Sequence, residues 1–185
     1  MKVKNSKEKK KLTLKSVIRW LIYYILIFFA FIFMTSGTML KPIILIPLAL
    51  CIAVGNNIII SAITGAVCGF LIDISCDKLI GYNAIILTVF CAFVTLIFEL
   101  YLRNKFINIL ILSAILSFIH GWLDYKFYYE IWNYENVDQI FSKVTVPVWI
   151  YTVISTIFVY LIIKLINHFL MPKEHLSLED AIKMN

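Results

Sequence analysis

Charged residues are scarce in this chain. They make up 15% of its 185 residues, whereas soluble domains average about 25%. Hydrophobic residues make up 62%, so nearly the whole length is needed for membrane spans of roughly 20 residues each, and a soluble domain is excluded. We expect one membrane domain over residues 17–170, with a basic tail (1–16) before it and a short polar tail (171–185) after it.

Motifs for catalysis or metal binding are lacking as well. The four cysteines show no C-x-x-C spacing and no accompanying histidines, so neither a zinc site nor a redox motif is predicted. The sequence has no Ser/His/Asp arrangement, no Gly-rich loop for phosphate and no array of charges within spans such as a pump needs. We therefore expect a protein that is not an enzyme and that needs no cofactor or metal.

Long apolar runs, in contrast, are abundant. Six of them predict an all-α bundle with six membrane spans, at residues 17–34, 38–54, 57–72, 83–102, 106–123 and 144–166. Helices satisfy their backbone in lipid, and the runs lack the alternation of barrel strands. From Pro42 to Val54 the second run covers only about 20 Å at 1.5 Å per residue, against a hydrocarbon core of roughly 30 Å. The second and third runs therefore form either two short spans or a re-entrant hairpin that turns at Gly55 to Asn57.

Lysine and arginine are distributed unevenly, and this predicts the orientation. With the N-terminus inside, thirteen of the seventeen basic residues lie on the inner side. The outer side keeps only Lys41, Lys78, Lys126 and Lys143. Both termini are therefore expected in the cytoplasm, and a re-entrant hairpin gives the same result. The basic N-terminal tail is expected to face anionic membrane lipids, and no nucleic-acid partner is expected.

The longest predicted connection, residues 124–143, is rich in aromatic side chains. Six of them lie between Tyr125 and Tyr134, interleaved with acidic residues. We expect a segment on the outer leaflet. It is either an aromatic belt that anchors the fifth and sixth spans or a docking surface for an extracytoplasmic partner.

Small residues recur every four positions in two predicted spans. In the third span they are Ser61, Gly65 and Gly69, which share one helix face, and in the fifth they are Ser113, Ser117 and Gly121. Small residues at this spacing let helix backbones approach closely in lipid. We expect these two faces to pack on each other within the bundle, and the alternative is a face reserved for another protein.

Ionisable residues occur at the outer ends of the same two spans. Asp73 follows Gly69 by one turn and ends its helix, where a negative charge meets the negative end of the helix dipole. It needs a salt bridge to Lys78 or Lys41, a role in capping the following turn, or a contact with a partner or ligand. His120 could titrate, and together with Gly121 and Asp124 it is a secondary candidate site. A lone histidine is nevertheless more often a packing residue. A membrane enzyme that uses Asp73, His120 and Asp124 is the least supported hypothesis, because no motif fixes an acid–base geometry.

Three short motifs follow one another between residues 41 and 84. They are Lys41-Pro42 with an apolar run that contains Pro47, Gly65-x-x-x-Gly69-Phe-Leu-Ile-Asp73, and Ile80-Gly81-Tyr-Asn-Ala84. This segment resembles the bacterial rod shape-determining protein MreD family. The rest of the chain agrees with that family in length, basic N-terminus and span pattern. The candidates for helix packing or partner binding are Ser61, Gly65, Gly69, Asp73 and Gly81.

The resemblance implies a subunit of the cell-elongation complex, which organises lateral peptidoglycan synthesis in the bacterial cytoplasmic membrane. It implies these partners: an MreC-like bitopic protein, an MreB-like filament, a RodA-type glycosyltransferase and a penicillin-binding transpeptidase. It also implies a bundle similar to the S components of energy-coupling-factor vitamin transporters. An S component that binds a small molecule is therefore the alternative. An S component would be expected to present small residues on the first span to a transport partner. The first span here is bulky from Tyr23 to Phe31, which counts against this alternative.

Overall fold

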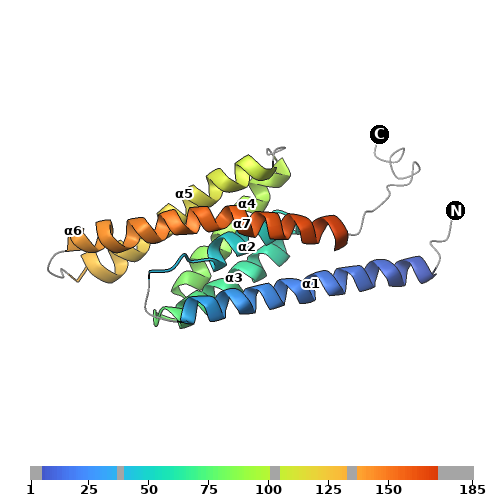
Figure 1. Ribbon diagram of the computed structural model, residues 1–185, viewed down its shortest axis with the longest axis horizontal. Helices are drawn as coiled ribbons and strands as arrows, with labels where there is room; N and C mark the ends of the chain where they lie inside the picture. The colour runs from blue at the N-terminus through green and yellow to red at the C-terminus, as the bar shows by residue number, and fades with distance from the viewer. Residues whose placement is uncertain (1–5, 37–39, 101–104, 133–136, 171–185) are drawn as a thin grey trace.

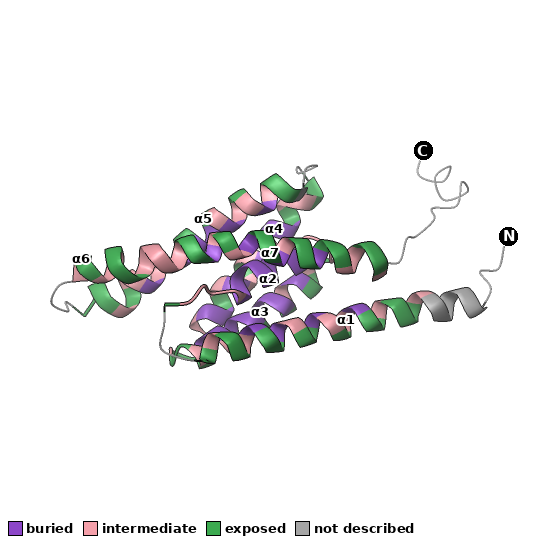
Figure 2. Ribbon diagram, in the orientation of Figure 1, coloured by how far each residue is buried: buried purple, intermediate pink, exposed green. Residues whose placement is uncertain are grey.

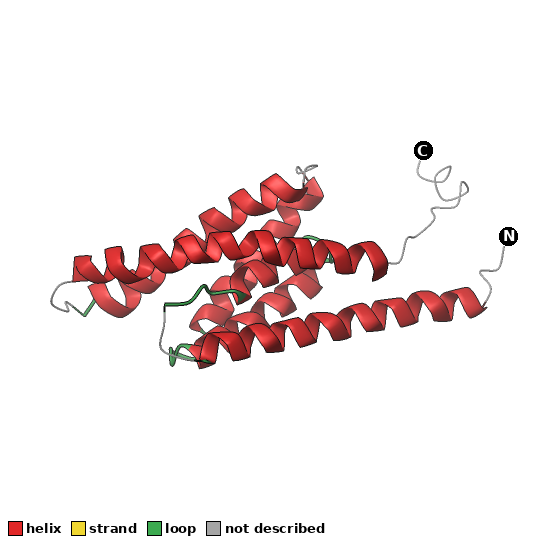
Figure 3. Cartoon of the chain, viewed as in Figure 1, coloured by secondary structure: helices red, strands yellow, loops and turns green. Residues whose placement is uncertain are grey.

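The computed structural model describes residues 6–36, 40–100, 105–132 and 137–170, and over these ranges it is helical without any strand. Figures 1 and 3 show a bundle of elongated helices. The long helices are α1 (Ser6–Thr35), α3 (Ile58–Ser75), α4 (Tyr82–Leu100), α5 (Lys105–Tyr125) and α7 (Val146–Leu170). Five helical segments within the described ranges are long and apolar enough to cross a membrane. The expected all-α fold is therefore confirmed, with five candidate spans in the described ranges where six were expected.

The first helix is longer than the predicted span. It begins at Ser6 and has 30 residues, so the described part of the basic tail continues the helix. At 1.5 Å per residue α1 is about 45 Å long, which exceeds a hydrocarbon core of roughly 30 Å. The candidate span within α1 begins only at Leu12, so the helix is longer than its apolar part.

The second predicted span contains only a short helix. This helix, α2 (Leu45–Ala53), has nine residues, and all of them are buried. The described chain is non-helical over residues 40–43. Lys41 precedes Pro42, and a residue before proline avoids helical backbone angles. Pro47 lies in the first helical turn, where its missing N–H is tolerated.

Contacts on either side of α2 show how far this segment reaches along the bundle. The N–H of Ile43 donates to Thr152 Oγ1 near the start of α7, at 3.0 Å. After α2, a Cβ on Gly55 would lie 3.6 Å from Asn167 Nδ2, near the end of α7. Thr152 and Asn167 are about 22 Å apart along a helix. The turn after α2 therefore lies at the opposite end of the bundle from Lys41.

The two ends of the bundle can be named by residues that lie there. The Arg19 end holds the turn after α2, where Arg19 Nη2 donates to Asn56 Oδ1 at 3.3 Å and Tyr23 Oη donates to Asn167 Oδ1 at 2.5 Å. The Asp73 end holds the end of α3 and the beginning of α4. The start of α1 and the end of α7 both lie toward the Arg19 end (Figure 1).

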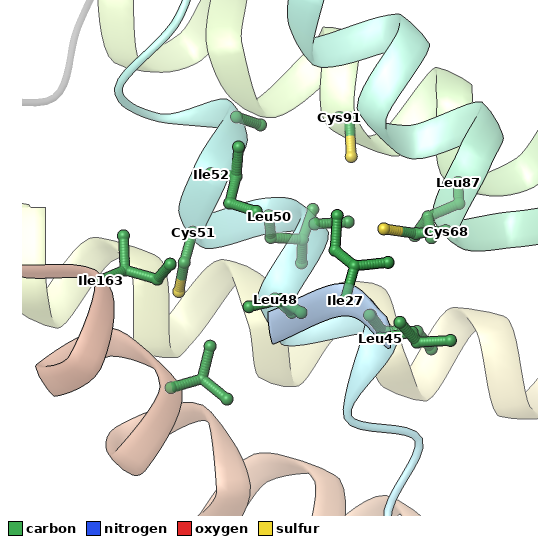
Figure 4. Packing of buried hydrophobic residues seen from close by; sticks show 14 of the residues in the cluster. Ile27, Leu45, Leu48, Leu50, Cys51, Ile52, Cys68, Leu87, Cys91 and Ile163 are labelled. Carbon is green, nitrogen blue, oxygen red and sulfur yellow. The ribbon is translucent and has the colours of Figure 1, made fainter. Parts of the chain in front are cut away.

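The hydrophobic core is centred on α2, which contacts α1, α3, α4, α5 and α7. Figure 4 shows Leu48, Leu50 and Ile52 of α2 among residues of the surrounding helices. Cys51, Cys68 and Cys91 belong to this core and pack there as free thiols. Tyr24, Phe28 and Phe29 of α1 are large exposed apolar side chains that suit contact with lipid tails. Figure 2 shows exposed positions, in green, recurring along α1.

The aromatic connection 124–143 is mostly helical where the structure describes it, so it lengthens the helices on both sides. A π-helix, η1 (Lys126–Glu130), continues α5, and α6 (Val137–Ile140) and η2 (Phe141–Thr145) lead into α7. The rings of Tyr125 and Phe141 lie 4.9 Å apart and join the two extensions. The segment from α6 to α7 has 34 residues, about 51 Å, so this hairpin extends beyond the other helices at the Asp73 end (Figure 1). Tyr134 lies outside the described residues.

Candidate functional site

The small-residue face of α3 packs on α4 and not on the fifth predicted span. A Cβ on Gly65 would lie 2.6 Å from the carbonyl oxygen of Leu87, and one on Gly69 would lie 2.5 Å from that of Asn83. Real side chains do not approach a backbone so closely, so only glycine allows this contact. The expectation of close packing within the bundle is met, but the expected mate is wrong. Both glycines are covered by α4 and are not free for a partner.

The second small-residue face, on α5, packs on α7 and on η2, which leads into it. Ser113 Oγ is 2.9 Å from Thr156 Oγ1, and a Cβ on Gly121 would lie 3.3 Å from Thr145 Cγ2. Ser117 is buried and donates to the Ser113 carbonyl at 2.6 Å. The two small-residue faces therefore pack on different partners, one on α4 and the other on α7.

Ser61, the first member of the α3 face, joins α3 to α2. It is fully buried, and its hydroxyl lies 3.1 Å from the Ala53 carbonyl oxygen and 3.0 Å from that of Asn57. Thr95 of α4 approaches the same Ala53 oxygen at 3.3 Å. The last carbonyls of a helix have no partner within it, so these hydroxyls satisfy an acceptor at the end of α2.

Asp73 caps the next helix. Its Oδ2 accepts the N–H of Gly81 at 2.8 Å, and its Oδ1 accepts the N–H of Asn83 at 3.0 Å. Gly81 is the N-terminal cap residue of α4, because its carbonyl accepts the N–H of Ile85 at 3.0 Å. A glycine has no side chain with which to cap a helix, and Asp73 supplies the missing oxygen from α3. The carboxylate thus lies at the positive end of the α4 dipole, which compensates for its place at the end of α3.

Gly81 is required by its backbone. Its φ is +100°, which residues with a side chain rarely adopt, while a Cβ there would meet no atom within 4 Å. Of the roles considered for Asp73, the contacts match capping. Lys78 forms its ion pair with Asp124 instead.

Asn83, which the sequence reasoning did not single out, connects Asp73 to His120. Its backbone N–H binds Asp73, while its side-chain Oδ1 accepts the Nε2–H of His120 at 2.7 Å. The other ring nitrogen of His120, Nδ1, lies 3.7 Å from Asp124 Oδ2. A polar chain therefore runs from Asp73 through Asn83 and His120 to the Asp124–Lys78 ion pair.

This polar chain is closed to solvent except at one end. Asp73 and Asn83 are fully buried and His120 is 1% exposed, so none of them can reach an external substrate. Lys78 and Asp124, however, line a cavity of about 290 Å³ at the Asp73 end of the bundle. Within the residues that the structure describes, no group of three or more His, Cys, Asp or Glu side chains could hold a metal ion. The buried part of this polar chain, from Asp73 to His120, is a structural connection. Its open end, at Lys78 and Asp124, is the candidate binding site.

The turn between α3 and α4 is held against the extension of α5. The N–H of Leu79 donates to Tyr128 Oη at 3.1 Å, and Lys78 Nζ lies 5.3 Å from the centre of the Tyr128 ring. Tyr82 stacks on Phe127 with ring centres 4.9 Å apart. These contacts fix the position of Lys78. These contacts could not be predicted from the sequence, because only the tertiary fold brings the aromatic segment next to residues 78–82.

No family model matches this chain, and neither does any curated protein or solved structure. Its function must therefore be argued from its own residues. The most informative of these are Gly65, Gly69, Asp73 and Gly81, because the structure gives each of them a specific role in one helix pair.

Proposed function

We propose that this protein is an MreD-like scaffold subunit of a bacterial cell-elongation complex, without catalytic activity of its own. One observation carries the proposal. Two of the three motifs that carry the resemblance form a single structural unit: Gly65 and Gly69 fit α4 against α3, and Asp73 caps α4 at Gly81. The spacing of these residues is therefore explained by one rigid hairpin, as expected for a motif that defines a fold.

The proposal places the hairpin formed by the extensions of α5 and α7 outside the cell. There it would meet the extracytoplasmic part of an MreC-like bitopic protein. Ile131 and Trp132 near its tip are strongly exposed, and Trp is enriched among the residues that dominate binding energy at interfaces. The RodA-type glycosyltransferase and the penicillin-binding transpeptidase would be reached through the spans or through this partner. The basic start of α1 would face the MreB-like filament and anionic lipid on the cytoplasmic side.

This assignment includes a finer description of the fold. We propose that residues 40–44 together with α2 complete a sixth crossing, because the two ends of this segment lie at opposite ends of the bundle. Both termini are then cytoplasmic, and the bundle is similar to the S components of vitamin transporters. A short, partly non-helical crossing is tolerated in a membrane when protein surrounds it, as it does here.

Depletion in a rod-shaped host tests the proposal. If the protein organises wall synthesis, depleted cells become round and swollen whatever vitamins are supplied. Affinity purification from native membranes in mild detergent then recovers an MreC-like protein and cell-wall synthases. Normal rods after full depletion, or growth restored by a vitamin precursor together with recovery of an ATPase module, would contradict the proposal and favour the S component.

A further inference from the structure

The cavity at the Asp73 end opens between helices that are distant in sequence. Residues from the end of α1, the segment before α2, the turn after α3, α5 and the α7 region line it. Its volume, about 290 Å³, lies at the lower limit of small-molecule sites in proteins. It is therefore large enough for a headgroup and too small for a whole lipid.

Positive side chains outnumber negative ones in the lining of this cavity. Lys41, Lys78 and Asp124 line it, and Lys78 and Asp124 neutralise each other as an ion pair. Lys41 donates to the Phe33 carbonyl at 3.0 Å and has no carboxylate partner in the part of the chain that the structure describes. An ammonium group has three donors, so Lys41 keeps donors and a net positive charge for a ligand.

Asp124 offers no free acceptor to a ligand in this cavity. Its Oδ1 has no partner among the described residues, but it is shielded from solvent, so a ligand in the cavity does not reach it. Its Oδ2 is engaged by Lys78. The cavity is thus suited to an anion that binds at Lys41.

The remaining walls are largely apolar and aromatic. Met34, Ile43 and Val148 lie among them, together with Tyr125 and Trp149. Aromatic residues of this kind gather at the level of lipid headgroups. An amphiphile matches this combination better than a free ion does, because its glycerol and upper acyl carbons can cover the apolar walls.

We propose that this cavity binds a phosphate-bearing group of net negative charge, supplied by the headgroup of an anionic lipid in the leaflet at the Asp73 end. The phosphate lies at Lys41, whose charge is not neutralised by any carboxylate among the described residues. The proposal does not depend on a role in cell elongation, because the site is complete within one chain. A failure of either proposal is therefore distinguishable from a failure of the other.

Thermal unfolding of the purified full-length protein in detergent tests the site with three probes. Dihexanoyl phosphatidylglycerol should raise the unfolding temperature and saturate, whereas dihexanoyl phosphatidylcholine should have little effect. Inorganic phosphate at the same concentration should act more weakly than the anionic lipid. An equal effect of inorganic phosphate would overturn the lipid as the source, and equal effects of the two lipids would overturn the anion site.

Substitutions then locate the binding. Lys41→Gln should weaken phosphatidylglycerol binding by at least about tenfold, the usual loss for a hydrogen bond to a charged group, and Lys41→Arg should restore most of it. Lys126→Gln is the matched control, because this lysine is at the same end, pairs with Glu130 on the surface and does not line the cavity. Val148→Trp should block the cavity without changing charge. Unchanged binding in Lys41→Gln, or an equal loss in Lys126→Gln, would overturn the proposal even if Val148→Trp did not fold.

Discussion

Asp73 accepts the backbone N–H of Asn83, ten residues further along the chain, and thereby caps a helix to which it does not belong. The same carboxylate also accepts the N–H of Gly81, which has a left-handed backbone and no side chain that could cap the helix. The end of α3 and the beginning of α4 are thus fixed by one side chain. Four predictions follow from this arrangement and from the contacts around it.

Removal of the Asp73 charge should loosen the α3–α4 turn. Asp73→Asn keeps the size of the side chain but removes its charge and thus the favourable interaction with the α4 dipole. It also replaces one acceptor oxygen with an NH2 group, which cannot accept the backbone N–H that faces it. We expect a loss of about 1–2 kcal/mol in the free energy of unfolding, measured in detergent by thermal or chemical unfolding. Asp77→Asn makes the same chemical change at an exposed residue with φ +48°, where Asn is well tolerated, and should change little. A similar loss in both variants would remove the capping argument.

Gly69→Ala should disrupt the α3–α4 pair although it adds only one methyl group. The new Cβ would lie 2.5 Å from the Asn83 carbonyl oxygen, so the two helices must separate. Overpacking of this kind costs about 1–3 kcal/mol, and Gly69→Leu should cost more. The readout is the yield of monodisperse protein and its unfolding temperature. Val67→Leu is the control on the partly exposed side of α3, and it should behave like the native protein.

His120 and Asn83 should be energetically coupled. His120→Ala or Asn83→Ala removes one side of a buried 2.7 Å hydrogen bond and leaves the other group without a partner, which costs about 1–3 kcal/mol. The double variant should cost less than the two single losses combined, because no orphaned group remains. Ser113→Ala, which removes a hydrogen bond to α7 instead, should add to Asn83→Ala without coupling. Additive losses for His120 and Asn83 would show that this bond has no net energetic role.

The native cysteines report the orientation directly. Cys76 is exposed in the turn after α3, whereas Cys51, Cys68 and Cys91 are buried. If the Asp73 end is outside, an impermeant thiol reagent should label the native chain in intact cells and should not label Cys76→Ser. On the Cys76→Ser background, a cysteine at Lys126 should be labelled and one at Asn104, which lies outside the described residues, should not. Labelling at Asn104 alone would place Asp73 in the cytoplasm.

The sequence predicted the long helices well because their apolar runs are long and uninterrupted. The expected third and fourth spans, 57–72 and 83–102, correspond closely to α3 and α4. The spacing of Gly65 and Gly69 also identified a close-packing face. It could not identify the mate, because a repeat of four places residues on one side of a helix and carries no information about which helix lies opposite.

The remaining differences arise from tertiary contacts. The extension of α5 stays helical because Phe127 and Tyr128 pack on Tyr82 and the α3–α4 turn, which composition alone does not indicate. Likewise, Asn83 lies inside a recognised motif, but its bond to His120 spans 37 positions. Lys78 forms a half-buried ion pair with Asp124, whereas Lys41 has no carboxylate partner among the described residues. Charge counting could not reveal this contrast, because it treats all four lysines of the predicted outer side alike.

The enclosed position of α2 means that its packing can be completed only late in the synthesis of this protein. Ile43 donates its N–H to Thr152, 109 positions later, and α2 is buried against helices that include α5 and α7. When residues 40–53 leave the ribosome, neither α5 nor α7 yet exists, so this segment is synthesised before two of its final neighbours. A polar N–H in lipid must then find a temporary acceptor. The bundle is thus completed only when synthesis reaches α7, and truncation before Thr152 should leave α2 without a stable place in the membrane.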